Sequence, residues 1–206
     1  MLGHLKNIDA DLCARVEDGL GMQGQAETIR PARPPIDMKP SPALSLILKA
    51  PKTLEGRKVG VLVTDGSDPA FVTALRTAVE KAGARLQVVA PKIGGARGKG
   101  GTTIEADHQL AGGPSILFDA VVVAASADEA LKLETEAAAI DWIRDAFGHL
   151  KVIGVVEASL GLAEEAGVEE DEGVVALNGT KDISAFITAA KNGRVWDREP
   201  RLRSPK

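Results

Sequence analysis

The chain has 206 residues, 44% of them hydrophobic and 26% charged, which suits one globular domain of roughly 150 residues with additional segments. Its net charge of −4 supplies no excess of Lys and Arg for a nucleic-acid partner. No apolar stretch approaches the ~20 residues that cross a bilayer, and the N-terminus lacks a secretory apolar core. The single cysteine, Cys13, excludes an intrachain disulfide, which suits a cytoplasmic protein. From the charge and the apolar pattern we expect no nucleic-acid or membrane partner.

Residues 1–22 have the pattern of one amphipathic helix. Apolar side chains recur there every three or four residues, on one stripe: Leu5, Ile8, Leu12, Val16 and Leu20. The stripe has no partner in its own segment, so we expect it to dock on another surface. Residues 23–43 carry five prolines and little that could fill a core, which predicts an extended linker.

Residues 44–194 alternate between strand and helix patterns. We expect strands at 44–49, 58–64, 85–91, 118–126, 151–156 and 172–178, and helices at 68–83, 128–150, 159–168 and 182–193. The glycine-rich stretch 92–113 predicts a hairpin or an irregular excursion. This order predicts a three-layer α/β domain with a parallel sheet, and the basic tail 195–206 is expected to lie loosely on its surface.

The first candidate site residue is Glu157, which ends the apolar run 152–156. Ligands bind at the carboxyl ends of strands in open α/β folds, where a carboxylate could act as a general base or a nucleophile. The simpler interpretation, which we favour, is an exposed loop residue that caps backbone N–H groups. The sequence identifies no partner residue for a catalytic role.

Ser159 lies in "EASLG", which is similar to the nucleophile elbow G-x-S-x-G except that Glu157 replaces the first glycine. A serine nucleophile also needs a base. His149 precedes the strand and should lie at the opposite end of the sheet, and His108 falls in the glycine-rich stretch. A Ser–His site is therefore disfavoured.

The remaining candidates have structural explanations. Asp65 and Asp68 follow the first long strand and could bind Mg²⁺, but turn formation and helix capping, with Pro69 at the first helical position, explain them better. "GGARGKGG" (94–101) does not match the phosphate-binding spacing G-x-x-x-x-G-K-[ST]. His4 and the other two histidines lie far apart in the sequence, so no zinc site is expected. Acidic neighbours disfavour a reactive Cys13, and Trp142 and Trp196 are expected to pack.

Two stretches carry a family resemblance: "KVGVLVTDGSDPAFVTALRTAVEKAGARLQVVAP" and "HLKVIGVVEASLGLAEEAGV". They resemble the ThiJ/PfpI branch of the class I glutamine amidotransferase-like superfamily, which implies a flavodoxin-like domain. Active members carry a Cys and then a His at the elbow, and a Glu in the first βα turn. In this chain those positions are occupied by Glu157, Ala158 and Phe71, so the resemblance implies a degenerate site without catalytic residues.

The order of the helix "HLKNIDADLCARVEDGLGM", the Pro-rich linker and the degenerate domain resembles the C-terminal portion of a large-subunit, clade 2 catalase. The resemblance implies a non-catalytic domain that packs on the catalase core and stabilises the homotetramer, with an extension to chaperone-like protection of other proteins. Haem belongs to the parent enzyme, which decomposes hydrogen peroxide in the oxidative stress response. This chain has no Tyr to ligate haem iron, so no cofactor or metal is expected in it.

Two alternatives to the structural role stay open. The first is a hydrolase or lyase that uses Glu157, with Asp65 or Asp68, in the cleft at the strand ends. The second is a small-molecule binding module in the same cleft. Turnover that is lost in Glu157→Gln would favour the first alternative.

Overall fold

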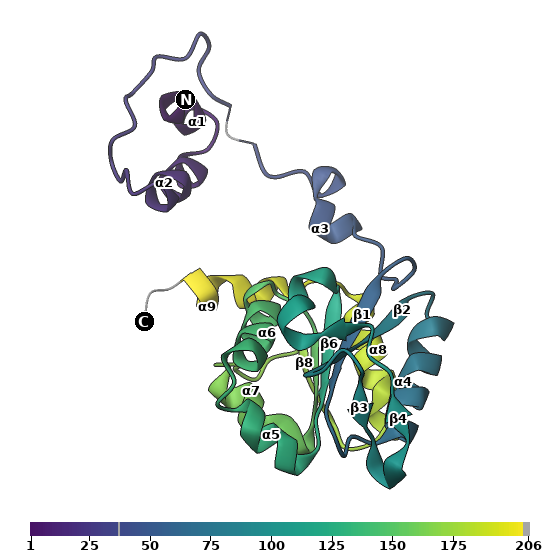
Figure 1. Ribbon diagram of the computed structural model, residues 1–206. Coiled ribbons are helices and arrows are strands. Elements are labelled where there is room, and N and C mark those ends of the chain that lie inside the picture. Colours follow the sequence, from purple (N-terminus) through teal and green to yellow (C-terminus); the bar gives the residue numbers. More distant parts are fainter. Residues whose placement is uncertain (37, 204–206) are drawn as a thin grey trace. The chain divides into compact units, whose positions relative to one another are not determined.

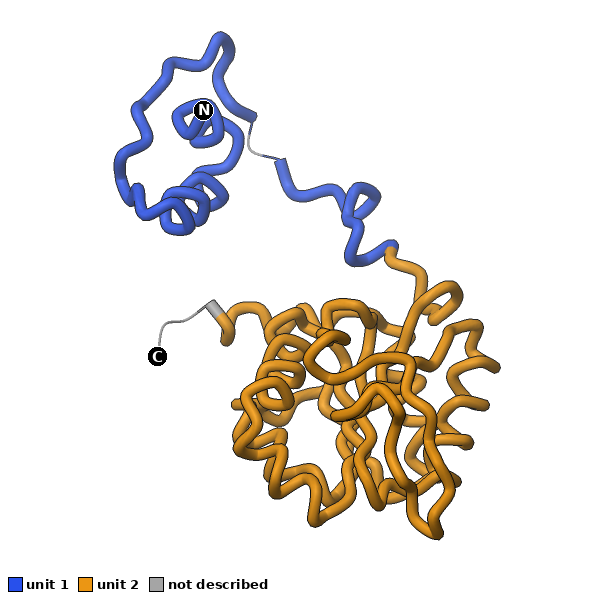
Figure 2. Tube along the Cα trace, viewed as in Figure 1, with its two compact units in different colours: residues 1–49 blue, residues 50–206 orange. Residues whose placement is uncertain are grey.

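The computed structural model describes residues 1–36 and 38–203, and the chain divides into two compact units, Met1–Lys49 and Ala50–Lys206 (Figure 2). The smaller unit holds three short helices and the proline-rich segment, and the larger unit is the α/β domain. The unit boundary follows Lys49, so the apolar run 44–49 groups with the smaller unit.

The N-terminal segment forms two helices, α1 (Leu2–Lys6) and α2 (Ala10–Gly19), so the expectation of one helix is wrong. Asp9 interrupts the helix. Its backbone is extended, with φ −155°, and its side chain accepts a hydrogen bond from the Leu12 N–H at 2.9 Å. Aspartate is a preferred N-cap because its carboxylate satisfies an N–H group that has no partner within the helix.

The buried face of this helix pair differs from the predicted apolar stripe. Gly3, Cys13 and Glu17 are buried, whereas Ile8 and Leu12 are 79% and 42% exposed. Because the helix restarts at Asp9, the residues of the predicted stripe do not share one helix. The apolar side chains expected to dock therefore remain largely on the surface.

Part of the expected linker is tied to the helices rather than extended. The Glu17 carboxylate accepts hydrogen bonds from the Gly24 N–H at 3.2 Å and the Ala26 N–H at 2.6 Å. The Asn7 side-chain amide donates to the Ile29 carbonyl at 2.7 Å. These bonds fold residues 24–29 back onto α1 and α2.

The run "LSLILK" (44–49) was expected to be a strand and is instead a short helix, α3 (Leu46–Lys49), preceded by a 3₁₀ turn over Pro42–Leu44. The Ser45 hydroxyl accepts a hydrogen bond from the Leu48 N–H at 3.2 Å, as a helix cap does. A short apolar run fits either a strand or a buried helix, and the local serine decides between them here.

The α/β domain is built on one six-stranded parallel sheet with the order β5-β2-β1-β6-β7-β8. Its strands are β1 (Lys58–Val63), β2 (Arg85–Ala90), β5 (His108–Gln109), β6 (Ala120–Ala124), β7 (Ile153–Val156) and β8 (Val174–Leu177). In register, Val59 lies beside Leu86 on one side and Ala120 on the other. This is the flavodoxin-like strand order with one short strand added, so the predicted fold class is confirmed.

Helices cover both faces of the sheet (Figure 1). One apolar cluster packs α4 (Pro69–Lys81) and α8 (Ile183–Lys191) on one face. The other face packs α5 (Ala127–Leu133), α6 (Ala137–Gly148) and α7 (Leu160–Glu165). The central strands are buried on both faces, which explains their continuous apolar sequences.

Two segments between the strands refine the expected elements. The helix expected at 128–150 is divided into α5 and α6, where the Thr135 hydroxyl donates to the Lys132 carbonyl and competes with helix continuation. The glycine-rich stretch contains an antiparallel hairpin formed by β3 (Ala96–Arg97) and β4 (Thr103–Ile104). A hairpin was one of the two structures expected there. Within the described residues, no helix combines the length and apolarity needed to cross a membrane.

The tail was expected to lie loosely on the surface, and this is wrong for residues 195–203. A 3₁₀ turn over Trp196–Arg198 leads into α9 (Glu199–Arg203), and the Arg198 side chain is fully buried. The rest of the tail, residues 204–206, lies outside the described residues. Trp196 is partly exposed, whereas Trp142 is buried and donates to the Gly113 carbonyl.

Candidate functional site

The carboxyl ends of β1, β6, β7 and β8 surround a cavity of about 550 Å³. The turns that follow these strands form its wall, together with the first turn of α4 and the tip of the β3–β4 hairpin. Its lining includes Gly66, Ser67, Asp68, Phe71, Lys99, Ser126, Glu157, Ala158, Asn178 and Gly179. This is the position at which open α/β sheets bind ligands.

The cavity brings together the three positions that the resemblance marked as degenerate. Glu157 and Ala158 start the 3₁₀ turn after β7, and Phe71 lies in the first turn of α4. Phe71 is buried and belongs to the apolar core. Glu157 is exposed, and its carboxylate has no hydrogen-bond or ion-pair partner among the described residues. Of the two carboxylates that line the cavity, Asp68 caps α4 and Glu157 has no bonded neighbour in the described part of the chain that would activate it.

Ser159 does not reach the cavity surface. It is fully buried, and its hydroxyl lies 3.5 Å from the Ala125 carbonyl. His149 follows α6 and lies at the opposite end of β7. His108 is on β5, four strands from β7, which is roughly 19 Å at ~4.8 Å per strand. Neither of these two histidines can therefore serve as the base for Ser159.

The aspartates after β1 have structural roles. Asp65 accepts a hydrogen bond from the Arg97 N–H at 2.7 Å, and Asp68 accepts one from the Ala70 N–H at 2.9 Å. The second bond is the expected N-cap of α4. Backbone amides of the glycine-rich hairpin are also bonded internally: Gly98 donates to Thr102, and Lys99 donates to Ser67, each at 2.8 Å. They are not free to cradle a phosphate.

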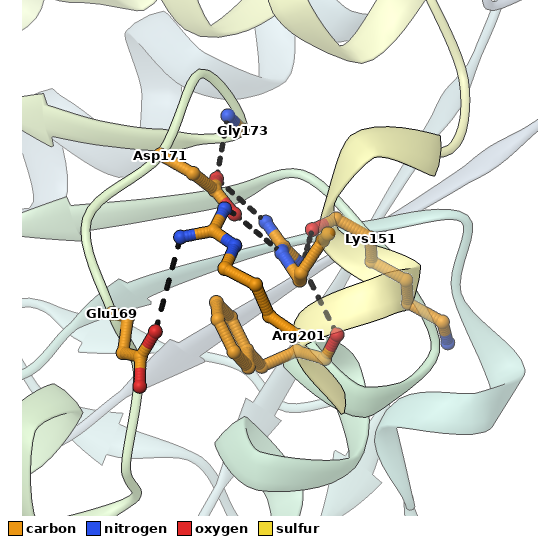
Figure 3. A network of polar contacts seen from close by, with 7 residues as sticks. Lys151, Glu169, Asp171, Gly173 and Arg201 are labelled. Carbon is orange, nitrogen blue, oxygen red and sulfur yellow. Dashed lines mark hydrogen bonds and ion pairs between the residues drawn. The ribbon is translucent and has the colours of Figure 1, made fainter. Parts of the chain in front are cut away.

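The most extensive buried polar network lies at the other end of the sheet, and sequence reasoning missed it (Figure 3). The Arg198 guanidinium binds both carboxylate oxygens of Asp171, at 2.6 and 2.9 Å, and stacks over the Phe147 ring at 4.1 Å. Asp171 also accepts from the Gly173 N–H at 2.8 Å and from Arg201 at 3.2 Å. Burial alone would raise the pKa of Asp171, but the bonds from Arg198 and Gly173 outweigh it and hold the pKa below its ordinary value.

The C-terminal segment also binds the turn between α6 and β7. Arg198 donates to the carbonyls of Phe147 and Lys151, at 3.1 and 2.9 Å, and the Val195 N–H donates to the Leu150 carbonyl at 2.8 Å. These bonds satisfy carbonyls in the last turn of α6 and just beyond it. The Lys151 ammonium is buried against the Ser115 carbonyl at 2.5 Å, and burial with nearby Arg194 lowers its pKa to about 8.

The chain lacks the residue that holds haem iron in catalases. It contains no tyrosine, and its histidines lie in α1, on β5 and after α6. Across residues 1–36 and 38–203, no three His, Cys, Asp or Glu side chains gather as metal ligands. The residues present therefore do not fit a haem or metal group.

Comparison with known proteins gives a consistent family. Residues 55–200 match the model of the C-terminal domain found in long catalases. The chain is 43% identical to Catalase C of Rhizobium meliloti over 209 residues, which is 98% of this chain and 29% of that protein. It is 33% identical to Catalase-B of Dictyostelium discoideum and 31% identical to Catalase HPII of Pseudomonas aeruginosa, covering 96% and 95% of this chain and 29% and 27% of those proteins.

The chain thus spans about three tenths of the length of these curated relatives. The matched region includes the whole parallel sheet and most of the C-terminal segment that carries Arg198. The chain belongs to the family of C-terminal domains found in long catalases.

Proposed function

We propose that this chain is the non-catalytic C-terminal domain of a haem catalase, and that it stabilises the catalase subunit and its oligomer by burying apolar surface against the catalase core. The parent protein would decompose hydrogen peroxide, as the names of the relatives indicate for those proteins. In this proposal the chain contributes packing to the parent, and the haem and its ligands belong to the core.

One observation carries the proposal: the smaller unit leaves large apolar side chains on its surface. They are Met1, Ile8, Leu12, Leu20, Met22, Ile36, Met38, Leu44, Leu46, Ile47 and Leu48. A unit of 49 residues that exposes this many large apolar groups is suited to packing against another surface. At ~25 cal/mol per Å², burial of a few hundred Å² contributes several kcal/mol before the cost of ordering.

We extend the proposal to chaperone-like protection of other proteins, because the same exposed side chains could bind apolar segments of unfolding chains. The chaperone-like role can be tested separately from the docking role. The chain should suppress light scattering by a heat-denatured client protein, and Ile8→Asp should reduce that suppression.

The second candidate function is a hydrolase, lyase or small-molecule binder in the strand-end cavity. The unpartnered Glu157 carboxylate in a cavity of about 550 Å³ favours it. The structural role is favoured instead because Ala158 and Phe71 occupy the other marked positions, and the Ser67 and Ser126 hydroxyls in the cavity donate to backbone carbonyls. Turnover of esters, amides or 2-oxoaldehydes that disappears in Glu157→Gln would establish the enzyme.

A chimera tests the structural role. This chain would replace the matching segment of Rhizobium meliloti Catalase C, and peroxide decomposition would be followed during heating. Ile8→Asp should shorten the half-life of the activity about tenfold, because burial of an Ile side chain is worth about 1.5–3 kcal/mol. The cause would be lost docking, since Ile8 is exposed in this chain and its substitution should not unfold it.

Ile93→Asp is the matched control, because Ile93 is a similarly exposed isoleucine of the α/β domain. Its half-life should equal that of the unsubstituted chimera. Circular dichroism of the isolated chains should show that both variants are folded. Equal half-lives for Ile8→Asp and Ile93→Asp would contradict docking through the smaller unit.

A further inference from the structure

The two edges of the six-stranded sheet differ in how well they are protected. β5 forms one edge and is only two residues long, and short edge strands resist pairing with another chain. β8 forms the other edge and has four residues, Val174–Leu177, with hydrogen bonds to β7 alone. Its sequence "VVAL" contains no proline or charge that would block pairing.

The backbone of β8 presents unused polar groups at this edge. The Ile153 N–H donates to the Gly173 carbonyl, and residues alternate in the ladder between facing the partner strand and facing away. Val174 and Ala176 therefore direct their backbone groups away from β7. The Val174 N–H is bonded to the Asp171 carbonyl, which leaves the Val174 carbonyl and both groups of Ala176 open along the described part of this edge.

Hollows lie beside β8 on both faces of the sheet. A cavity of about 540 Å³ next to Val175 is lined on its apolar side by Ala185, Ala189 and Val195. On the opposite face, a cavity of about 340 Å³ next to Val174 and Ala176 is lined by Leu160, Ala163 and Val168. An added strand would direct alternate side chains into the two hollows, because successive residues of a strand point to opposite faces.

The ends of β8 carry opposite charges. The segment before the strand contains four consecutive acidic residues, 169–172, and Lys181 follows the strand and is exposed. Glu169 and Asp171 are paired with Arg201 and Arg198, whereas Glu170 and Glu172 are exposed and have no ion pair among the described residues. An antiparallel copy of the same segment would place Lys181 of one chain beside the acidic end of the other.

We propose that β8 pairs antiparallel with β8 of a second copy of this chain, about a two-fold axis at Val175, and joins two sheets into one. In this register Val174 lies opposite Ala176 of the other copy, and the Ala176 N–H donates to the Val174 carbonyl in both directions. The open backbone groups, the hollows on both faces and the complementary charges all fit a second copy. The pairing involves only the α/β domain and does not depend on the proposed catalase role.

Cysteine cross-linking tests the register. The axis places Val175 opposite itself in a non-hydrogen-bonded pair, whose Cα atoms lie about 4.5 Å apart, within the range of a disulfide. In a Cys13→Ser background, Val175→Cys should form a disulfide-linked dimer under mild oxidation. The matched control is Gln109→Cys on the opposite edge, which should stay monomeric. Failure of Val175→Cys to cross-link, or equal cross-linking at both edges, would overturn the proposal.

Sedimentation equilibrium of the full chain tests the association itself. The unsubstituted chain should show a monomer–dimer equilibrium, and Lys181→Glu should raise its dissociation constant at least about tenfold. Adding Glu170→Lys to Lys181→Glu should restore association, because the charges are then exchanged. Lys81→Glu on α4 has the same charge change away from β8 and should have no effect.

Ala176→Pro gives an independent variant, because it removes the N–H that donates across the axis without removing a bond to β7. It should abolish the dimer while circular dichroism shows a folded chain. A chain that is monomeric at every concentration overturns the proposal. So does a dimer that persists in both Ala176→Pro and Lys181→Glu, because that dimer must use another surface.

Discussion

A single buried residue, Arg198, ties the C-terminal segment to the α/β domain. Its guanidinium pairs with both oxygens of Asp171 and donates to two carbonyls of the α6–β7 turn. The planar fork of arginine suits this arrangement, because a lysine ammonium cannot bind a carboxylate in two places and stack on Phe147 at once. One side chain thus joins three segments that are distant in the sequence.

Arg198→Met should destabilise the α/β domain by about 3–5 kcal/mol, because it leaves the Asp171 carboxylate buried without its main partner. Urea unfolding followed by tryptophan fluorescence measures the change. Arg201→Met is the matched control, since Arg201 contacts the same carboxylate from a partly exposed position and should cost less than about 1 kcal/mol. Equal losses in the two variants would contradict the central role of Arg198.

The pH dependence of the same variant follows from the lowered pKa of Asp171. In the unsubstituted chain, this pair stabilises the fold above the unfolded pKa of about 3.9, and the stabilisation is lost as pH falls through the folded value. Without Arg198, burial raises the pKa of Asp171, and its protonation relieves the buried charge. The difference in the free energy of unfolding between the unsubstituted chain and Arg198→Met should therefore be largest at neutral pH. It should become smaller below about pH 4.

Among the elements, β1 and β7 contain glycines where the sheet packs most closely. A Cβ on Gly60 of β1 would lie 2.5 Å from the Phe118 ring, and one on Gly154 of β7 would lie 2.7 Å from Leu177. Glycine normally weakens a strand, so its presence here reflects the space that the neighbouring side chains occupy. Each glycine therefore leaves room for a neighbouring side chain, Phe118 at Gly60 and Leu177 at Gly154.

Gly60→Ala should destabilise the domain by about 1–3 kcal/mol, because the new methyl group overpacks the core against Phe118. Thermal unfolding measures this change. Gly148→Ala at the end of α6 is the control, since nothing lies within 4 Å of its Cβ, and it should be neutral or stabilising by roughly 0.5–1 kcal/mol. If both variants were equally stable, close packing at Gly60 would not explain the glycine.

At the scale of the whole molecule, the chain consists of two units with different kinds of stabilisation. The α/β domain buries its central strands between two helical layers. The smaller unit depends on polar bonds, mainly those of Glu17 and Asn7, and leaves much of its apolar surface exposed. Residues 38–44 are exposed.

Limited trypsin digestion should cut first at the exposed lysines just before the α/β sheet, Lys49 and Lys52, because prolines follow Arg33 and Lys39 and block cleavage there. Intact-mass measurement should then show a resistant fragment that begins at residue 50 or 53. This fragment should keep the strand signature in circular dichroism, because its core is complete without the smaller unit. Early cleavage within residues 58–195 would show that the domain is less compact than its packing indicates.

Much of the larger unit followed from local signals in the sequence. The apolar runs predicted five of the six sheet strands, β1, β2, β6, β7 and β8, and Asp68 with Pro69 marked the start of α4. These signals act over a few residues, so they survive without knowledge of the rest of the fold. The positions Glu157, Ala158 and Phe71 came instead from the family resemblance, and they line one cavity.

Other features depended on contacts between distant residues. Asp9 is a local N-cap signal, although the apolar stripe favoured a single helix through it. In contrast, nothing near Arg198 in the sequence indicates that it is buried beside Asp171, 27 residues away. The position of β8 at an open edge likewise depends on strand order. Composition and periodicity determined the layers, because burial of apolar faces is a local pattern. Only the tertiary structure decided which charges are paired and which edge is open, since both depend on segments brought together by folding.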